Sequence, residues 1–308
     1  MALSEEMKNK IFQEAKILLV DDNQINLFVL NKVFEQFGIH ADCVPSGKIC
    51  LKKAEKKEYD IIFMDHMMPD LDGVETLKML KQQPGFTTPV VVLTANYGEN
   101  LEKEYKAVGF AEYMIKPAEP KRVREILERY LIRDDDSQVG EAFLKVADST
   151  SLEDKVNSQE KSGLEKQSGI ITKEMMEKLK ENSYVTKRER MIAFGFTIID
   201  NLIETGMSEE EYEELLQIFK EESVNKLIDC DNFQKNNDLK NYAIIVHGLK
   251  NDAGMISDMD LSEHAKEHEI QSKGGNELFV KEQWQDLKEH WENTIDRINA
   301  YFEEKRIS

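Results

Sequence analysis

Five polar side chains follow short apolar runs in the first 132 residues, where each run is expected to end as a β-strand. They are Asp21, Asp22, Asp65, Thr94 and Lys116. The carboxyl ends of parallel strands share one edge of a sheet, so we expect these side chains to converge. Three carboxylates gathered there would repel one another, and a hard divalent cation, Mg²⁺ above all, would relieve that repulsion. A carboxylate beside such a cation can attack phosphorus, while a hydroxyl and an ammonium stabilise the transferring oxygens.

A second candidate reactive group, His247, lies in a helical stretch near the other end of the chain. On a helical wheel, Leu249 points to the core, whereas His247, Lys250 and Asn251 share the opposite face, which we expect to face solvent. An exposed imidazole is partly neutral and nucleophilic near pH 7. Lys250, one turn along, can offset the charge of an incoming phosphoryl group. A histidine beside a lysine is, on its own, usually only surface.

The five side chains after the apolar runs converge only if those runs are strands of one parallel sheet, and the hydrophobic pattern predicts such a sheet. Apolar, β-branched runs alternate with helical patterns of 10–15 residues, which is typical of βαβ units around a buried sheet. The expected strands cover residues 17–20, 39–44, 61–64, 90–93 and 111–115. We therefore expect an α/β domain with five parallel strands over residues 14–132.

Beyond residue 132 the pattern changes twice. Residues 133–170 contain three consecutive aspartates and six serines without sustained periodicity, which predicts a flexible linker that proteases cut first. Residues 171–308 show helical periodicity without strand-like alternation, as in the apolar positions around Leu216 and Trp291. Short turns between these stretches predict an all-α, four-helix bundle with an N-terminal helical extension.

Composition and charge exclude several classes of function. The chain has 308 residues with a net charge of −19, of which residues 171–308 carry −12, so nucleic acid is not an expected partner. No apolar run is long enough to cross a bilayer, and the first ten residues lack an apolar signal core. Three cysteines without CxxC spacing indicate neither a disulfide framework nor a zinc site. We expect a cytoplasmic protein without membrane insertion.

The motifs of the first domain resemble those of response-regulator receiver domains, in the style of hybrid histidine kinases. They read LLVDDN at residues 18–23, FMDHMMPDLDG at 63–73, LTAN at 93–96 and IKP at 115–117. The resemblance implies a flavodoxin-like fold that binds Mg²⁺ and accepts a phosphoryl group on Asp65. It implies that Asp21, Asp22, Asp65 and the Met67 carbonyl hold the metal. It also implies that Thr94 and Tyr113 are switch residues and that Lys116 binds the phosphate.

The second domain is similar to histidine phosphotransfer (Hpt) domains over residues 186–305. The similarity rests on the sequence AIIVHGLK at residues 243–250, followed by Ala253 and Gly254 and then by Leu261, Ala265 and Glu269. It implies that His247 carries phosphate and that Lys250 assists. The family usually has glycine and then a small residue after the lysine, where this chain has Asn251 and Asp252. Asn251 is expected to crowd His247, and Asp252 to add negative charge near an anionic reaction.

Two functions follow from these resemblances. The first is a two-component phosphorelay protein that accepts phosphoryl from a sensor histidine kinase on Asp65 and relays it through His247. The second is a phosphorylation-switched scaffold whose Hpt-like bundle is silent. No glycine-rich nucleotide loop occurs, so we expect no kinase activity with ATP and no enzyme beyond the receiver's own aspartate chemistry. Expected partners are a histidine kinase and other receiver or Hpt proteins; the sequence does not specify an oligomeric state.

Overall fold

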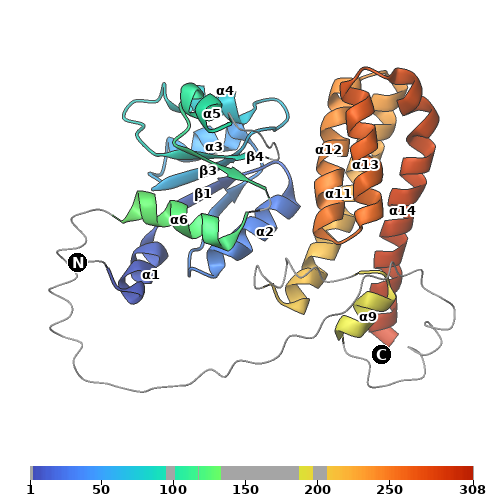
Figure 1. Ribbon diagram of the computed structural model, residues 1–308, viewed down its shortest axis with the longest axis horizontal. Helices are drawn as coiled ribbons and strands as arrows, with labels where there is room; N and C mark the ends of the chain where they lie inside the picture. The colour runs from blue at the N-terminus through green and yellow to red at the C-terminus, as the bar shows by residue number, and fades with distance from the viewer. Residues whose placement is uncertain (1–2, 95–100, 117, 133–186, 197–206, 308) are drawn as a thin grey trace.

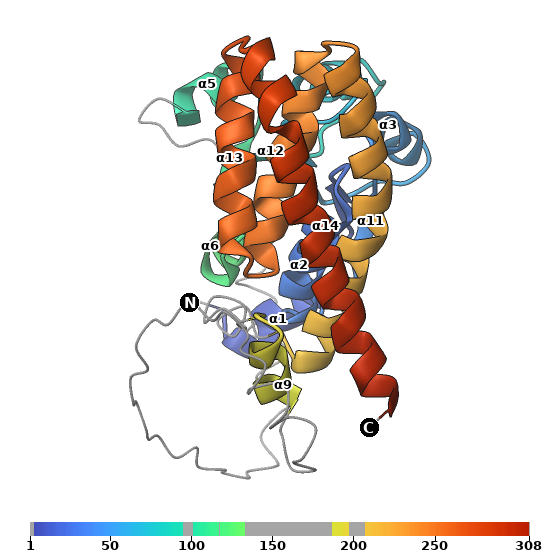
Figure 2. The same ribbon diagram turned by 90° about the vertical axis from the view of Figure 1, so that its right-hand side faces the viewer.

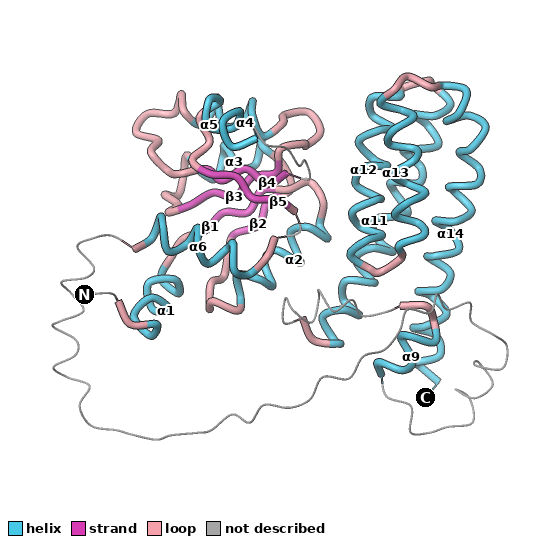
Figure 3. Tube along the Cα trace, viewed as in Figure 1, coloured by secondary structure: helices cyan, strands magenta, loops and turns pink. Residues whose placement is uncertain are grey.

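The computed structural model describes residues 3–94, 101–116, 118–132, 187–196 and 207–307. An α/β part lies before residue 133 and a helical part after residue 186, as Figures 1 and 3 show. The predicted linker at residues 133–170 lies outside the described residues.

Five parallel strands form the sheet of the α/β part. They are β1 (Ile17–Val20), β2 (Asp42–Val44), β3 (Ile61–Asp65), β4 (Val90–Thr94) and β5 (Glu112–Ile115), in the order β2-β1-β3-β4-β5. The strands β1, β3 and β4 are buried along their whole length, which explains why their sequences are continuously apolar. This order is flavodoxin-like, and the predicted five-stranded sheet is confirmed.

Six helices cover the two faces of this sheet in the described residues. They are α1 (Glu5–Glu14), α2 (Gln24–Glu35), α3 (Gly47–Ala54), α4 (Gly73–Leu80), α5 (Leu101–Val108) and α6 (Pro120–Leu131). Alternate strand residues point to opposite faces, so Leu19 and Phe63 pack with α1, α2 and α6. Leu18 and Met64 pack with α3, α4 and α5. The sheet is therefore buried between two helical layers, which leaves its carboxyl edge available for chemistry.

The described residues of the helical part form a short helix and four long ones. The short helix is α9 (Lys187–Ala193), and the long ones are α11 (Glu209–Lys235), α12 (Leu239–Met255), α13 (Met259–Lys273) and α14 (Glu277–Ile307). Each long helix contacts two of the others, and Figure 2 shows them running side by side. Their core contains fully buried Trp291, Tyr212 and Tyr242. Across the described segments, no helix is both long enough and apolar enough to span a bilayer.

Side-chain caps fix where these long helices begin. Ser208 and Glu211 form a capping box at the start of α11, in which each side chain satisfies a backbone N–H of the other residue. Asp258 caps α13 and also accepts hydrogen bonds from Thr294 and Arg297 of α14. The second cap therefore also ties two helices of the bundle together.

The two parts of the chain meet along one face of α2. Ile25 and Val29 of α2 are buried in the same apolar cluster as the core of the bundle, and Phe28 packs against that cluster. Both α11 and α12 contact α2. Lys32 of α2 forms an ion pair of 3.1 Å with Glu211 of α11 at the edge of this contact. The carboxyl edge of the sheet is thus held beside α11 and α12.

The structure differs from the sequence-based expectations in three details. The helix α1 was not expected, because a single buried residue, Phe12, is too weak a periodic signal. The helix α3 ends at Ala54 rather than near Glu58, because the lysine-rich stretch that follows has no apolar residue to bury. The strand β2 begins at Asp42 rather than at Ile39, which instead packs under α2.

Candidate functional site

Three carboxylates meet at the carboxyl edge of the sheet. Asp21 and Asp22 directly follow β1, and Asp65 is the last residue of β3, the strand that pairs with β1 in parallel. One oxygen of each carboxylate lies within 4.8 Å of one oxygen of the other two. Asp21 and Asp65 are buried, so water screens their repulsion poorly. This set of close, oxygen-only donors is what a hard divalent cation requires.

Lys116 places a positive charge between two of these carboxylates. It follows β5, and its Nζ lies 2.6 Å from Oδ2 of Asp21 and 2.6 Å from Oδ1 of Asp65. Burial alone would lower the pKa of Lys116, but the two aspartates raise it above its ordinary value. The ammonium therefore stays charged where a phosphoryl oxygen would otherwise meet only carboxylates.

One ammonium does not balance three carboxylates. Burial, followed by repulsion from Asp21, raises the pKa of Asp22 to about 7. Burial likewise raises the pKa of Asp65, and the attraction of Lys116 opposes the shift only in part. The cluster thus has an excess of negative charge that a cation would stabilise.

A chain of aromatic and hydroxyl groups leads away from the carboxylates. Thr94, the last residue of β4, is buried, and its Oγ1 lies 3.0 Å from the hydroxyl of Tyr105 on α5. The same hydroxyl lies 2.9 Å from Nδ1 of His66, the residue after Asp65. Tyr113 of β5 stacks on the ring of Tyr105 at a centroid distance of 6.4 Å. Thr94 and Tyr113 are thus linked through Tyr105, a residue that sequence reasoning did not single out.

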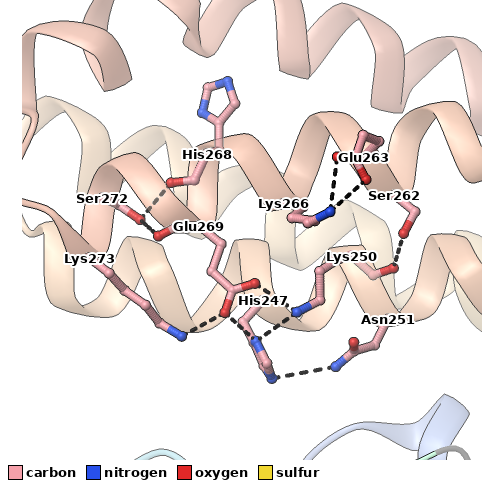
Figure 4. A network of polar contacts seen from close by, with 10 residues as sticks. All are labelled: His247, Lys250, Asn251, Ser262, Glu263, Lys266, His268, Glu269, Ser272 and Lys273. Carbon is pink, nitrogen blue, oxygen red and sulfur yellow. Dashed lines mark hydrogen bonds and ion pairs between the residues drawn. The ribbon is translucent and has the colours of Figure 1, made fainter. Parts of the chain in front are cut away.

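His247 lies on the opposite side of the same region, on α12. Its Nδ1 lies 2.6 Å from Oε1 of Glu269 on α13, as Figure 4 shows. Because a carboxylate can only accept, Nδ1 carries the proton and donates it to Glu269. Nε2 is then the unprotonated nitrogen, and the Asn251 amide approaches it through Nδ2 at 3.5 Å, a contact that Figure 4 marks. The imidazole is therefore held in one tautomer with Nε2 as its nucleophilic atom.

Glu269 is the centre of this arrangement. Besides His247, it accepts from Lys250 at 2.7 Å and from Lys273 at 2.6 Å. Burial alone would raise the pKa of Glu269, but these three neighbours hold it well below its usual range. The sequence pattern that suggested an Hpt domain includes Glu269, yet its role as the partner of the histidine emerged only with the packing of α13 on α12.

Two expectations about His247 and its neighbours were wrong. The imidazole does not lie on an open solvent face: its side chain is 17 % exposed, because Glu269 and the α/β part cover it. Asp252 does not present a free negative charge to the reaction, because it is buried and paired with Lys226 of α11. Lys250 binds Glu269 and approaches Nδ1 at 3.3 Å, so its ammonium lies on the Nδ1 side of the ring.

One pocket joins the two reactive regions. Its wall on the α/β side includes Asp22, Asp65, Met67, Thr94 and Lys116, and its wall on the bundle side includes Lys226, His247, Gly248 and Asn251. Gly248 lies close to the receiver side of the pocket, since a Cβ at that position would be 4.0 Å from Nδ2 of Asn23, an ordinary contact. Three of the residues singled out as reactive do not line this pocket: Asp21, which lies within 4.8 Å of Asp22 and Asp65, Lys250, which lies on the Nδ1 side of the histidine, and Tyr113, which lies beyond Tyr105.

Comparisons with known proteins concern the α/β part. Residues 17–128 match the response regulator receiver domain family. The chain is similar to probable histidine kinase 1 of rice, at 29 % identity over 150 residues, covering 38 % of this chain and 16 % of that protein. It is similar to the signal transduction histidine-protein kinase BarA of Escherichia coli, at 31 % identity over 115 residues, covering 37 % and 12 %. The chain thus spans only a small part of the curated relatives that it matches.

Solved structures give a corresponding match. One is the receiver domain of the sensor histidine kinase PA1611 from Pseudomonas aeruginosa, crystallised with a magnesium ion in its active site cleft. It is 30 % identical and covers 38 % of this chain and 97 % of that one, with a TM-score of 0.35. Another is the chemotaxis protein CheY4 of Vibrio cholerae, at 31 % identity, covering 38 % and 98 %, with a TM-score of 0.35.

Proposed function

Since residues 17–128 are a receiver domain like those of hybrid histidine kinases, we propose that this chain is a two-component phosphorelay protein whose Asp65 and His247 exchange a phosphoryl group. The pocket that both side chains line carries this proposal. A phosphoryl group on Asp65 would enter a space that is also lined by His247, whose Nε2 is the unprotonated nitrogen. The helical part then acts as an Hpt domain.

In the receiver, Asp65 is the acceptor. Its carboxylate attacks the phosphorus of a donor, the O–P bond forms, and the donor's bond to phosphorus breaks. Lys116 is placed to bind a phosphoryl oxygen, and the Thr94 hydroxyl to bind another. A Mg²⁺ ion held by Asp21, Asp22 and Asp65, with the Met67 carbonyl, would supply the positive charge that the carboxylate cluster lacks.

In the bundle, His247 is the second acceptor. Its Nε2 lone pair attacks the phosphorus of the Asp65 acyl phosphate, so the N–P bond forms and the Asp65 oxygen leaves as a carboxylate. Nδ1 keeps its proton, and the phosphorylated ring is cationic. Glu269 stabilises that positive charge through its hydrogen bond with Nδ1–H. The reverse step uses the same contacts.

The source and the destination of the phosphoryl group belong to this proposal as well. We assign the role of donor to the phosphohistidine of a sensor histidine kinase and the role of next acceptor to another receiver. In this view the described domains transfer phosphoryl groups and do not use ATP. Cytoplasmic histidine kinases, receivers and Hpt proteins are then the partners.

A labelling experiment tests the proposal on the full chain. A small phosphodonor with Mg²⁺ is expected to give an acyl phosphate first and then an alkali-stable, acid-labile histidine phosphate. Asp65→Asn should carry no label, and His247→Gln should carry acyl phosphate alone. His290→Gln, a matched change on α14, should behave as the wild type does. Omitting Mg²⁺ should suppress both products.

A phosphorylation-switched scaffold is the second candidate, and one contact favours it. Asn251 places its amide 3.5 Å from the nitrogen that would attack phosphorus, where bulk slows the reaction. If wild-type chain carries acyl phosphate but never histidine phosphate, and Asn251→Gly does not restore transfer, the scaffold reading replaces the relay.

A further inference from the structure

Asp252 of α12 is a buried carboxylate at the contact between the two domains. Its side chain is 3 % exposed, and each of its oxygens has one partner. Oδ2 accepts from Nζ of Lys226 on α11 at 2.9 Å, within the bundle. Oδ1 accepts from Nδ2 of Asn23, which belongs to the receiver. One carboxylate therefore joins the bundle to the receiver beside the pocket.

Burial makes the partners of Asp252 important. A carboxylate left unpaired once the receiver covers it is costly, so the bundle must supply a counter-charge. Lys226 does so, and it also pairs with Glu222 at 2.6 Å. Burial alone would lower the pKa of Lys226, but Asp252 and Glu222 raise it. The remaining oxygen of Asp252 then requires a donor from the surface that covers it.

Asn23 supplies this donor through its Nδ2 group, because its side-chain oxygen is already used to cap α2. Oδ1 of Asn23 caps α2 by accepting from the backbone N–H of Ile25 at 2.8 Å and of Asn26 at 3.3 Å. The cap fixes which end of the amide faces α2, so the Nδ2 group faces the bundle. An aspartate at position 23 would cap α2 equally well but would present an oxygen to Asp252.

We propose that Asp252 is a specificity-determining residue, which selects receivers that offer an amide donor at the position directly after the acidic pair. This inference rests on the proposed relay, because it names the partner with which His247 exchanges phosphate. The chain's own receiver satisfies the requirement through Asn23. A receiver with a carboxylate at that position is rejected by repulsion across the contact, since specificity arises from unfavourable contacts as well as favourable ones.

A charge exchange in the full chain tests the proposal. Asn23→Asp keeps the cap, removes the donor and places two carboxylates face to face. Asp252→Asn in the same chain restores a donor–acceptor pair with reversed polarity, while Lys226 keeps Glu222 as its partner. Gln24→Glu is the matched control, because it adds the same charge one residue away at an exposed position. Asn23→Ser keeps a capping oxygen without adding charge.

Docking is measured without phosphate, by hydrogen exchange of the α2 and α12 amides at the contact. We expect Asn23→Asp to speed exchange about tenfold or more, the double variant to return it towards wild type, and Gln24→Glu to leave it unchanged. Asn23→Ser should give an intermediate effect. The inference would be overturned if the exchange rates of Asn23→Asp equalled those of the wild type. It would also be overturned if the double variant exchanged as fast as Asn23→Asp alone.

Phosphotransfer is measured on the same variants, and this separates the inference from the proposed function. Rapid-quench labelling should show the histidine phosphate of Asn23→Asp forming about tenfold more slowly, with recovery in the double variant. The acyl phosphate on Asp65 is followed in the same samples, so an effect on the receiver itself is visible. If wild-type chain forms no histidine phosphate, the relay fails, while the exchange data still decide whether Asp252 selects its receiver.

Discussion

In the proposed relay, Glu269 acts on His247 from the side opposite to the transferred group. Its carboxylate accepts from Nδ1–H and would stabilise the cation that phosphorylation of Nε2 creates. In Glu269→Gln the amide oxygen can still accept from Nδ1–H, but the charge is lost. We expect histidine phosphate to form about tenfold more slowly, a loss of about 1.4 kcal/mol of transition-state stabilisation. Rapid-quench labelling measures this rate.

The control for this change is Lys273→Ala. Lys273 touches Glu269 at 2.6 Å from the exposed side of α13, and the hydrogen bond with His247 remains without it. A rate in Lys273→Ala that fell as far as in Glu269→Gln would mean that any change of charge around Glu269 slows the reaction, and that its negative charge beside the imidazole has no specific role.

The buried His268, the residue before Glu269, is expected to make the free energy of unfolding depend on pH. Burial, followed by repulsion from His264, lowers the pKa of His268 to about 4, and its Nδ1 lies 2.7 Å from the Tyr242 hydroxyl. The unfolded chain binds a proton there near pH 6.5, so this stabilisation is complete above pH 6.5 and is lost as the pH falls towards 4. Relative to His268→Gln, wild-type chain should lose about 2 kcal/mol of unfolding free energy between pH 7 and pH 4.5.

Urea unfolding at the two pH values measures that difference. The change in unfolding free energy between the two pH values is taken for each protein, and the two changes are then subtracted. This subtraction cancels the titration of the remaining groups, which the two chains share. A parallel loss of stability in both proteins would show that the acid sensitivity of the bundle arises elsewhere.

At the scale of elements, the loop from β3 to α4 holds Asp65 through a close backbone contact. Gly73 donates its N–H to the carbonyl of His66 at 3.0 Å, and a Cβ on Gly73 would lie 2.3 Å from the Asp65 carbonyl oxygen. We expect Gly73→Ala to push α4 from β3, to lower stability by about 1–3 kcal/mol and to reduce labelling of Asp65. Thermal unfolding and acyl phosphate yield are the measurements.

Gly254→Ala is the matched change for comparison. A Cβ at Gly254 would meet only Ser262 Oγ at 3.8 Å, which is an ordinary contact, and alanine favours helix at this position of α12. This variant should be at least as stable as the wild type. Equal behaviour of the two variants would show that the contact beneath Asp65 tolerates a side chain.

Elements and strand ends were largely predictable, because they depend on local patterns. The continuous apolar runs of β1, β3 and β4 are visible in the sequence, so the convergence of Asp21, Asp65 and Lys116 followed from topology. The roles of Tyr105 and Glu269 depend on how α5 and α13 pack. The sequence gives no periodic signal for such contacts.

Contacts between domains were the least predictable. Helical periodicity in α12 identifies the face that is buried in the bundle. It does not tell whether the other face, which carries His247, meets water or a second domain, so His247 was expected to face solvent. The same limit applies to α2, which has apolar residues on both sides: Leu27 and Leu30 pack with the sheet, whereas Ile25 and Val29 pack with the bundle. The excess of buried apolar residues on α2 was the available signal, and it indicates a helix covered on two sides.

At the scale of the whole molecule, the docking of α2 on α11 and α12 would make the proposed transfer between Asp65 and His247 a reaction within one chain. The Asn23–Asp252 hydrogen bond and the Lys32–Glu211 ion pair hold the two walls of the pocket together. Tethering of this kind corresponds to an effective concentration on the order of millimolar. The rate of transfer in wild-type chain should therefore not depend on the protein concentration.

Mixing two inactive chains tests this arrangement. Asp65→Asn retains His247, and His247→Gln retains Asp65, so phosphate can reach a histidine only between chains. At about 1 µM of each, transfer should be at least about a hundredfold slower than in wild-type chain and should rise linearly with concentration. Each chain's own docked domain also covers the group that its partner must reach, which slows the reaction further. Transfer in the mixture as fast as in wild-type chain would mean that the two domains exchange phosphate between molecules and that the contact through α2 does not guide the reaction.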